Sequence, residues 1–176
     1  ISGYEISLDK PIYGIPVGAF NGKTTLIKCV LPEKLERIEH EAFAGTALTG
    51  AVLLPEGLKY IAGFSHTKIT DVQFPSTLET IGPYAFDSCT SLMAELTFPE
   101  SVRTIASCAF SGSAIKGQLF LPHNLEYIGS SAFSSCKGLT GSLVLPDKLE
   151  IIPSGAFSNC GFTGTLTLPK GLFEIG

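Results

Sequence analysis

The sequence predicts a solenoid, a chain wound into stacked turns of nearly equal length. Three observations support this prediction. A proline preceded by Leu or Phe recurs at intervals of 23, 20, 24, 23, 24 and 23 residues, at Pro32, Pro55, Pro75, Pro99, Pro122, Pro146 and Pro169. Apolar residues recur three and six positions after each of these prolines. An Ala-Phe pair follows in most copies, with its ring at Phe20, Phe43, Phe86, Phe110, Phe133 and Phe157. One copy is too short to bury its own apolar side chains, so the copies must stack to fold.

Each copy begins with a predicted strand. In the copy from 139 to 162, Leu143 and Leu145 alternate with Ser142 and Val144. This period of two places the leucines on one side of a strand and the residue between them on the other. Pro146 has no N–H for a sheet and a fixed φ, so the strand must end and the chain must bend there.

The second half of each copy predicts two further sides of a flattened loop. Leu149 and Ile152 form a second inward pair, and the residues from Pro153 to Gly155 indicate another corner. Ala156 lets the backbone pack closely, and the Phe157 ring requires a place in the interior. The equivalent rings of all copies are therefore expected to stack in one file.

Aligning the copies gives seven turns and the start of an eighth, which Gly176 ends. An early copy has Asp9 in the proline position, with Ile6 and Leu8 as its strand. The copy from Pro55 to Pro75 is shorter, so we expect Phe64 to take the aromatic position and the turn to be irregular. Residues 1–176 are thus expected to form a single solenoid domain, which both ends suggest is a fragment of a longer chain.

These copies resemble a known repeat family. Leu-x(2–3)-Leu-x-Leu-Pro, then Leu-x2-Ile-Gly and Ala-Phe-x2-Cys, is similar to the BspA-like leucine-rich repeats of bacterial surface proteins, over essentially the whole chain. The resemblance implies an α/β-type leucine-rich-repeat solenoid. That fold would be right-handed, with one parallel strand per 20–24-residue repeat on the concave side and irregular, short 3₁₀ or helical turns on the convex side. It also implies a secreted or cell-surface location and a role in adhesion.

Composition excludes some classes of function. The net charge is −4, and no run of Lys or Arg is present to neutralise nucleic-acid phosphates. No apolar stretch is long enough to span a bilayer. The segment from 18 to 25, GAFNGKTT, has three residues between its glycines where a phosphate-binding loop has four. We therefore expect no nucleotide, cofactor or metal to be bound.

The five cysteines and three histidines do not predict a catalytic site. Cys89, Cys136 and Cys160 share one position of the repeat, so Cys136 and Cys160 lie on neighbouring turns. Their spacing permits a disulfide, but a column of buried free thiols is the favoured interpretation. The histidines His40, His66 and His123 occupy three different positions of the repeat, so we expect them to be separate surface residues.

The exposed side of the strands is the better candidate for a functional surface. Several residues between the inward strand leucines are larger and more apolar than a solvated strand requires, and Tyr60, Tyr127 and Ile151 follow just after the proline corner. We expect Phe120, Tyr127, Val144 and Ile151 to form one apolar patch across two turns. The candidate partner-binding residues on the concave face are Val30, Leu53, Tyr60, Phe120, Tyr127, Val144 and Ile151.

The sequence therefore predicts a non-enzymatic module that binds a protein or a glycan, within an exported bacterial surface protein. One alternative is a structural spacer that holds another domain away from the cell and has no ligand of its own. Another is part of a carbohydrate-degrading enzyme. No two carboxylates stand out with hydrolase spacing in a cleft, because Glu36, Glu79, Glu126 and Glu150 share a column expected to face water, with Lys59 and Arg103 between them.

Overall fold

The computed structural model describes residues 3–8 and 10–176, and these form a solenoid of about seven stacked turns. The predicted corner at Asp9 lies outside the described residues. The strands before the proline corners are β1 (Tyr4–Ser7), β3 (Leu26–Val30), β5 (Thr49–Leu53), β7 (Lys68–Gln73), β10 (Lys116–Gln118), β12 (Gly138–Thr140), β13 (Leu143–Val144) and β15 (Leu166–Thr167). The strands after these corners are β2 (Gly14–Ile15), β4 (Arg37–Ile38), β6 (Tyr60–Ile61), β8 (Thr80–Ile81), β9 (Thr104–Ile105), β11 (Tyr127–Ile128), β14 (Ile151–Ile152) and β16 (Glu174–Ile175).

The strands after the corners build the more continuous sheet. Six of them pair in parallel in the order β11-β9-β8-β6-β4-β2, and β14 pairs with β16. Within residues 3–8 and 10–176, the strands before the corners form only the pairs β1-β3, β5-β7, β10-β12 and β13-β15, plus a bridge between Thr97 and Phe120. The sequence predicted one strand per repeat, so the second strand is an addition to the predicted fold.

Length variation explains this difference. The segment after each proline has constant length, so its short strands stay in register from turn to turn. The segment before the proline gains or loses residues between copies, and the β5–β7 pairing accordingly shifts register between Gly50 and Ala51. A parallel ladder cannot continue through an unmatched residue without such a break.

The arcs around the phenylalanines contain turns, and no helix occurs in the part of the chain that the structure describes. Around Phe43, the Ala42 and Ala44 N–H groups donate to carbonyls three residues earlier, whereas the Phe43 N–H donates 2.8 Å to the Gly63 carbonyl of the next turn. Backbone bonds within and between turns thus alternate. The predicted short helical turns do not form, because every second N–H is used by the neighbouring turn.

The arcs bend through left-handed backbone positions two residues before and two residues after the aromatic residue. Glycine occupies some of these positions and other residues occupy the rest, as in Gly45 with a φ of 63° and Ser131 with a φ of 56°. Only glycine adopts this conformation without a steric cost of about 1–2 kcal/mol. The non-glycine members are Glu41, His66, Tyr84, Ser88, Cys108, Ser131, Ser135 and Asn159.

The predicted file of phenylalanine rings is confirmed. Seven rings stack face to face through all the arcs, with centroids 5.1–5.8 Å apart and planes within 17° of parallel, in the order Phe20, Phe43, Phe64, Phe86, Phe110, Phe133 and Phe157. Phe64 fills the aromatic position of the short turn, as predicted. Phe74 and Phe98 meet this file edge-on. Leucine and isoleucine columns on the other two sides complete the buried core.

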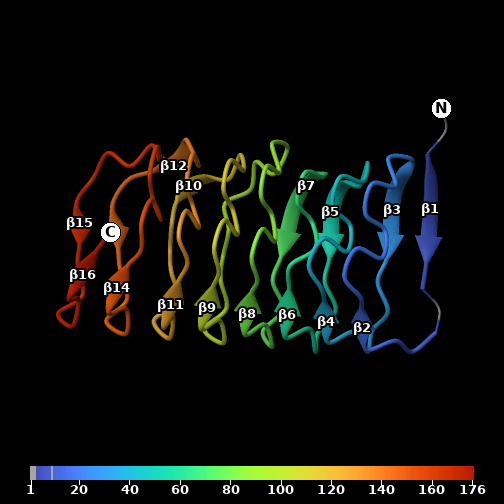
Figure 1. The fold of residues 1–176 in the computed structure, drawn as a ribbon, viewed down its shortest axis with the longest axis horizontal. Helices are drawn as coiled ribbons and strands as arrows, with labels where there is room; N and C mark the ends of the chain where they lie inside the picture. Colours follow the sequence, from blue (N-terminus) through green and yellow to red (C-terminus); the bar gives the residue numbers. More distant parts are fainter. Residues whose placement is uncertain (1–2, 9) are drawn as a thin grey trace.

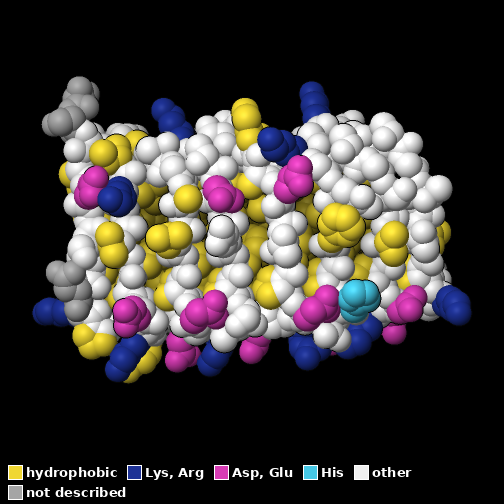
Figure 2. Space-filling model, turned by 180° about the vertical axis from the view of Figure 1, so that it is seen from behind, with side chains coloured by type: hydrophobic (Ala, Val, Ile, Leu, Met, Phe, Trp, Pro, Cys, Tyr) yellow, Lys and Arg dark blue, Asp and Glu magenta, His cyan; other side chains and the backbone are white. Residues whose placement is uncertain are grey.

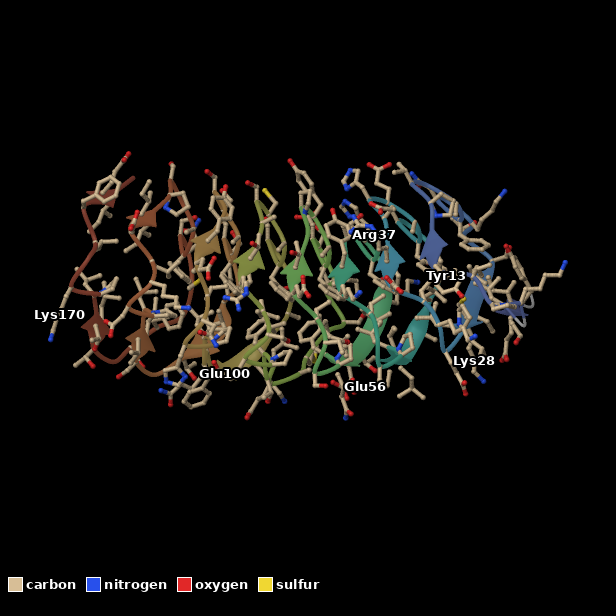
Figure 3. All side chains as sticks on the ribbon, turned by 90° about the horizontal axis from the view of Figure 1, so that it is seen from below. Tyr13, Lys28, Arg37, Glu56, Glu100 and Lys170 are labelled. Carbon is tan, nitrogen blue, oxygen red and sulfur yellow. The ribbon has the colours of Figure 1, made fainter. Side chains whose placement is uncertain are left out.

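The turns run in a nearly straight line from β1 to β15 and β16 in Figure 1. Two broad surfaces result, and we name them by their strands. The strand face carries the outward side chains of the strands before the corners, and the ladder face carries those of the strands after them. Figure 3 shows Arg37, on the ladder face, on the opposite side of the coil from Lys28, Glu56 and Glu100. Within the described residues, no helix has the length and apolar character needed to cross a membrane.

Candidate binding surface

The strand face carries a row of exposed apolar side chains. Val30, Leu53, Phe120 and Val144 each lie two residues before a corner proline and are 51%, 79%, 65% and 55% exposed. Each outward residue is flanked by inward neighbours that hold the strand to the core, so the exposed side chain cannot turn inward. Figure 2 shows hydrophobic side chains across the middle of one broad face. The sequence predicted their exposure correctly.

Two members of this row line a shallow hollow. Phe120 and Val144 lie on neighbouring turns beside Pro122 and Pro146, and Glu100, Gln118 and His123 supply polar groups around the hollow. Its volume is about 390 Å³. The hollow is open to solvent and combines a ring, an aliphatic side chain and hydrogen-bonding groups, as contact surfaces on solenoids commonly do.

The remaining candidates lie on the ladder face. Tyr127 and Ile151 line a second hollow, with Glu126 and Lys148, that shares no lining residue with the first. The prediction of one patch joining Phe120, Tyr127, Val144 and Ile151 is therefore wrong. The proline corner separates the two halves, because it turns the chain from one face of the coil to the other.

Tyr60 is also on the ladder face, where another side chain covers it. The guanidinium carbon of Arg37 lies 4.3 Å from the centre of the Tyr60 ring. Burial and, after it, the Glu39 carboxylate raise the pKa of Tyr60. A cation over the ring face is a favourable contact within the protein, so Tyr60 offers less free surface than Phe120.

Several charged side chains on the ladder face pair with one another, and the glutamate column there faces water as expected. Lys59 Nζ lies 3.4 Å from Glu36 Oε2, and Arg103 Nη1 lies 2.8 Å from Glu126 Oε1. Lys148 Nζ is 3.8 Å from the same Glu126 oxygen. These pairs bridge neighbouring turns, whereas Glu79 and Glu150 on the same face form no ion pair in the described part of the chain.

Acidic side chains border the apolar row of the strand face, a feature that the sequence analysis missed. Glu33, Glu56, Glu100 and Asp147 each follow directly after a corner proline and are exposed. Figure 2 shows this acidic border below the hydrophobic row, with a histidine within it. The His123 backbone N–H donates 3.0 Å to Glu100, and the His123 ring lies 3.0 Å from its other oxygen. The contact with the His123 side chain lowers the pKa of Glu100.

The comparison with known families agrees with this architecture. The family described as "BspA type Leucine rich repeat region (6 copies)" matches residues 4–63 and 62–176. The chain belongs to this family. The BspA-type repeat thus accounts for nearly the whole sequence, as the resemblance of its motifs implied. No curated protein sequence matches the chain.

Solved structures of bacterial leucine-rich-repeat proteins are similar to this BspA-type chain. A leucine-rich-repeat protein of T. pallidum has a TM-score of 0.68 and 26% identity, over 99% of this chain and 73% of that one. One from Bacteroides ovatus has a TM-score of 0.60 and 19% identity, over 98% of this chain. The chain spans 47% of the length of the Bacteroides ovatus protein. A leucine-rich cell surface protein from Faecalibacterium prausnitzii has a TM-score of 0.42 and 21% identity, over 97% and 59% of the two chains.

The cysteines of the BspA-type repeats are free thiols, as the favoured interpretation predicted. Cys89, Cys136 and Cys160 donate 3.0–3.1 Å to the phenylalanine carbonyl of the preceding turn. Thr46, Thr67 and Ser113 fill the same position in other turns, and their hydroxyls donate to the phenylalanine carbonyl of their own turn. Burial raises the pKa of Cys89 to about 11 and that of Cys136 to about 12. The column therefore has a structural role.

Two of the histidines share a hollow, contrary to the prediction that all three lie apart. His40 and His66 line one depression together with Glu41, Tyr84 and Asp87. His40 Nε2 lies 3.4 Å from Glu41 Oε1, and His66 Nε2 lies 3.5 Å from Asp87 Oδ2. The short turn brings them together, because its missing residues shift His66 in register. Among the described residues, no group of three or more His, Cys, Asp or Glu could hold a metal ion.

Proposed function

We propose that this BspA-type solenoid is a non-enzymatic binding module that engages a protein or glycan through its strand face. The observation that carries the proposal is the exposed hollow at Phe120 and Val144, where a ring and an aliphatic side chain lie beside the polar groups of Glu100, Gln118 and His123. The ladder face is less suited to a partner, because Lys59, Arg103 and Lys148 pair with glutamates of neighbouring turns and Arg37 covers the Tyr60 ring. Binding would depend on buried area and shape and would require no cofactor.

The setting we propose is an exported bacterial surface protein in which residues 1–176 form one solenoid domain. Family membership supports this setting, since the relatives matched in structure are bacterial leucine-rich-repeat proteins. A spacer that holds another domain away from the cell would have the same stacked core. It would have no use for an exposed ring such as Phe120, so a binding assay separates the two functions.

The test is a comparison of two matched double variants. Phe120→Ser with Val144→Ser removes the apolar hollow of the strand face, and Tyr127→Ser with Ile151→Ser removes an exposed aromatic and aliphatic pair of the ladder face. Each is screened against immobilised extracellular proteins and a glycan array. We expect only the strand-face variant to lose the ligands of the parent chain. Equal binding by all three chains would contradict the proposal, and a parent chain that binds nothing would favour the spacer.

A further inference from the structure

The members of the acidic border lie one or two turns apart along the strand face. Successive turns of a parallel ladder lie about 4.8 Å apart. Glu33 and Glu56 belong to neighbouring turns, whereas Glu100 and Asp147 are two turns apart, or about 10 Å. The hollow at Phe120 and Val144 lies beside the second pair, with Glu100 in its lining. Carboxylates and exposed apolar groups therefore run side by side along the coil.

These carboxylates have little compensation from the chain itself. In the part of the chain that the structure describes, no Lys or Arg forms an ion pair with Glu33, Glu56 or Asp147, and Glu100 pairs with His123. Lys148 follows Asp147 directly, but its Nζ lies 3.0 Å from Asn124 Oδ1 and 3.8 Å from Glu126 Oε1. These four carboxylates are thus available to a partner. Positive charge on the same face comes from Lys28, Lys68 and Lys116, which are exposed on β3, β7 and β10.

We propose that the partner seated on the strand face is an extended basic segment of a protein, with Lys or Arg at every third residue. This inference rests on the proposed binding function and specifies the ligand. An extended polyproline II segment has three residues per turn and a rise of about 3.1 Å per residue, so every third side chain points the same way at about 9.3 Å. That repeat matches the separation of Glu100 and Asp147 across two turns.

The hollow suits the remainder of such a segment. Lys and Arg carry long apolar stems, which can pack on Phe120 and Val144 while their charged ends reach the carboxylates. The exposed face of the Phe120 ring also attracts a cation. Strand-like segments match less well, because their side chains repeat on one side at about 6.7 Å.

The probe for this inference is a synthetic 12-residue peptide of repeated Lys-Pro-Leu, in which proline favours the extended conformation. Two controls are the Glu-Pro-Leu repeat and a peptide of the same composition with its lysines clustered. We expect the full chain to bind the Lys-Pro-Leu peptide in preference to both, and more weakly as salt is added. Glu100→Gln with Asp147→Asn should weaken binding about fivefold or more.

A matched variant controls for total charge. Glu79→Gln with Glu150→Gln makes the same change in net charge on the ladder face. Neither residue forms an ion pair in the described structure. This variant should change the affinity for the Lys-Pro-Leu peptide by less than about twofold. The inference is overturned by equal losses in the two double variants, or by equal binding of the three peptides. If a ligand from the screen depends on Phe120 and Val144 but not on Glu100 and Asp147, the proposed function stands and this inference is wrong.

Discussion

The stacked rings make a quantitative prediction about stability, in which Phe110→Ala is the decisive change. The Phe110 side chain is fully buried and lies 5.3 Å from both stacked neighbours, Phe86 and Phe133. Phe74 and Phe98 also meet its ring edge-on at 6.5 and 5.8 Å. Replacing a buried phenylalanine by alanine costs about 3–5 kcal/mol, and each aromatic pair adds about 0.5–1.5 kcal/mol beyond the buried area. We therefore expect a loss near the upper limit, about 4–5 kcal/mol.

The same change near the N-terminal end of the file is the control. Phe20 is only partly buried and stacks on one ring, Phe43, at 5.1 Å. Phe20→Ala should cost roughly half as much, or about 2 kcal/mol. Urea unfolding followed by circular dichroism measures both free energies, provided that the denaturant slope is unchanged. Equal losses for the two variants, or less than about 2 kcal/mol for Phe110→Ala, would refute the idea that the rings form one cooperative spine.

Three further changes test individual parts of the structure. Gly45 and Ser131 both have a left-handed backbone conformation. Gly45→Ala should therefore lower the free energy of unfolding by about 1–2 kcal/mol, although no atom obstructs the new methyl group, and Ser131→Gly should raise it by about 0.5–1 kcal/mol. Thermal unfolding measures both changes. The wild-type chain should lose stability relative to Cys136→Ser as pH rises from 9 towards 12. The Cys136 thiol ionises near pH 9 in the unfolded chain but has a pKa of about 12 in the folded chain, so high pH favours the unfolded state. Urea unfolding of both chains at a series of pH values would contradict this if the two stability curves stayed parallel. Glu126→Gln removes the ion pairs with Arg103 and Lys148, but it should lower the free energy of unfolding by no more than about 1 kcal/mol because these pairs are exposed. A larger loss in urea unfolding would show that ion pairs on the ladder face hold the turns together.

The sequence predicts the stacked core well because the core depends on periodicity. A residue repeated about every 23 positions must lie above its equivalent once the turns stack, so the positions of Phe43 and Phe110 follow directly. The same argument identified the outward position of Phe120 and the shared position of Cys89 and Cys136. Even the irregular copy retained its aromatic position at Phe64.

Features that depend on the path of the chain between these positions were not predictable in the same way. The corner at Pro122 turns the backbone onto another face, so Phe120 and Tyr127 are close in sequence but lie in different hollows. The meeting of His40 and His66 depends on how the short turn closes, which a shortened copy alone does not specify. The acidic border does not follow from periodicity, because Ser76, His123 and Lys170 interrupt the column of residues that follow the corner prolines.

The most direct test of the account is a methyl NMR titration of the full chain with the Lys-Pro-Leu peptide. Val30, Leu53 and Val144 place exposed methyl groups on the strand face, and Ile151 places exposed methyl groups on the ladder face. We predict that the first three signals shift as peptide is added and that Ile151 does not. Shifts centred on Ile151, or of equal size on both faces, would contradict the assignment of binding to the strand face.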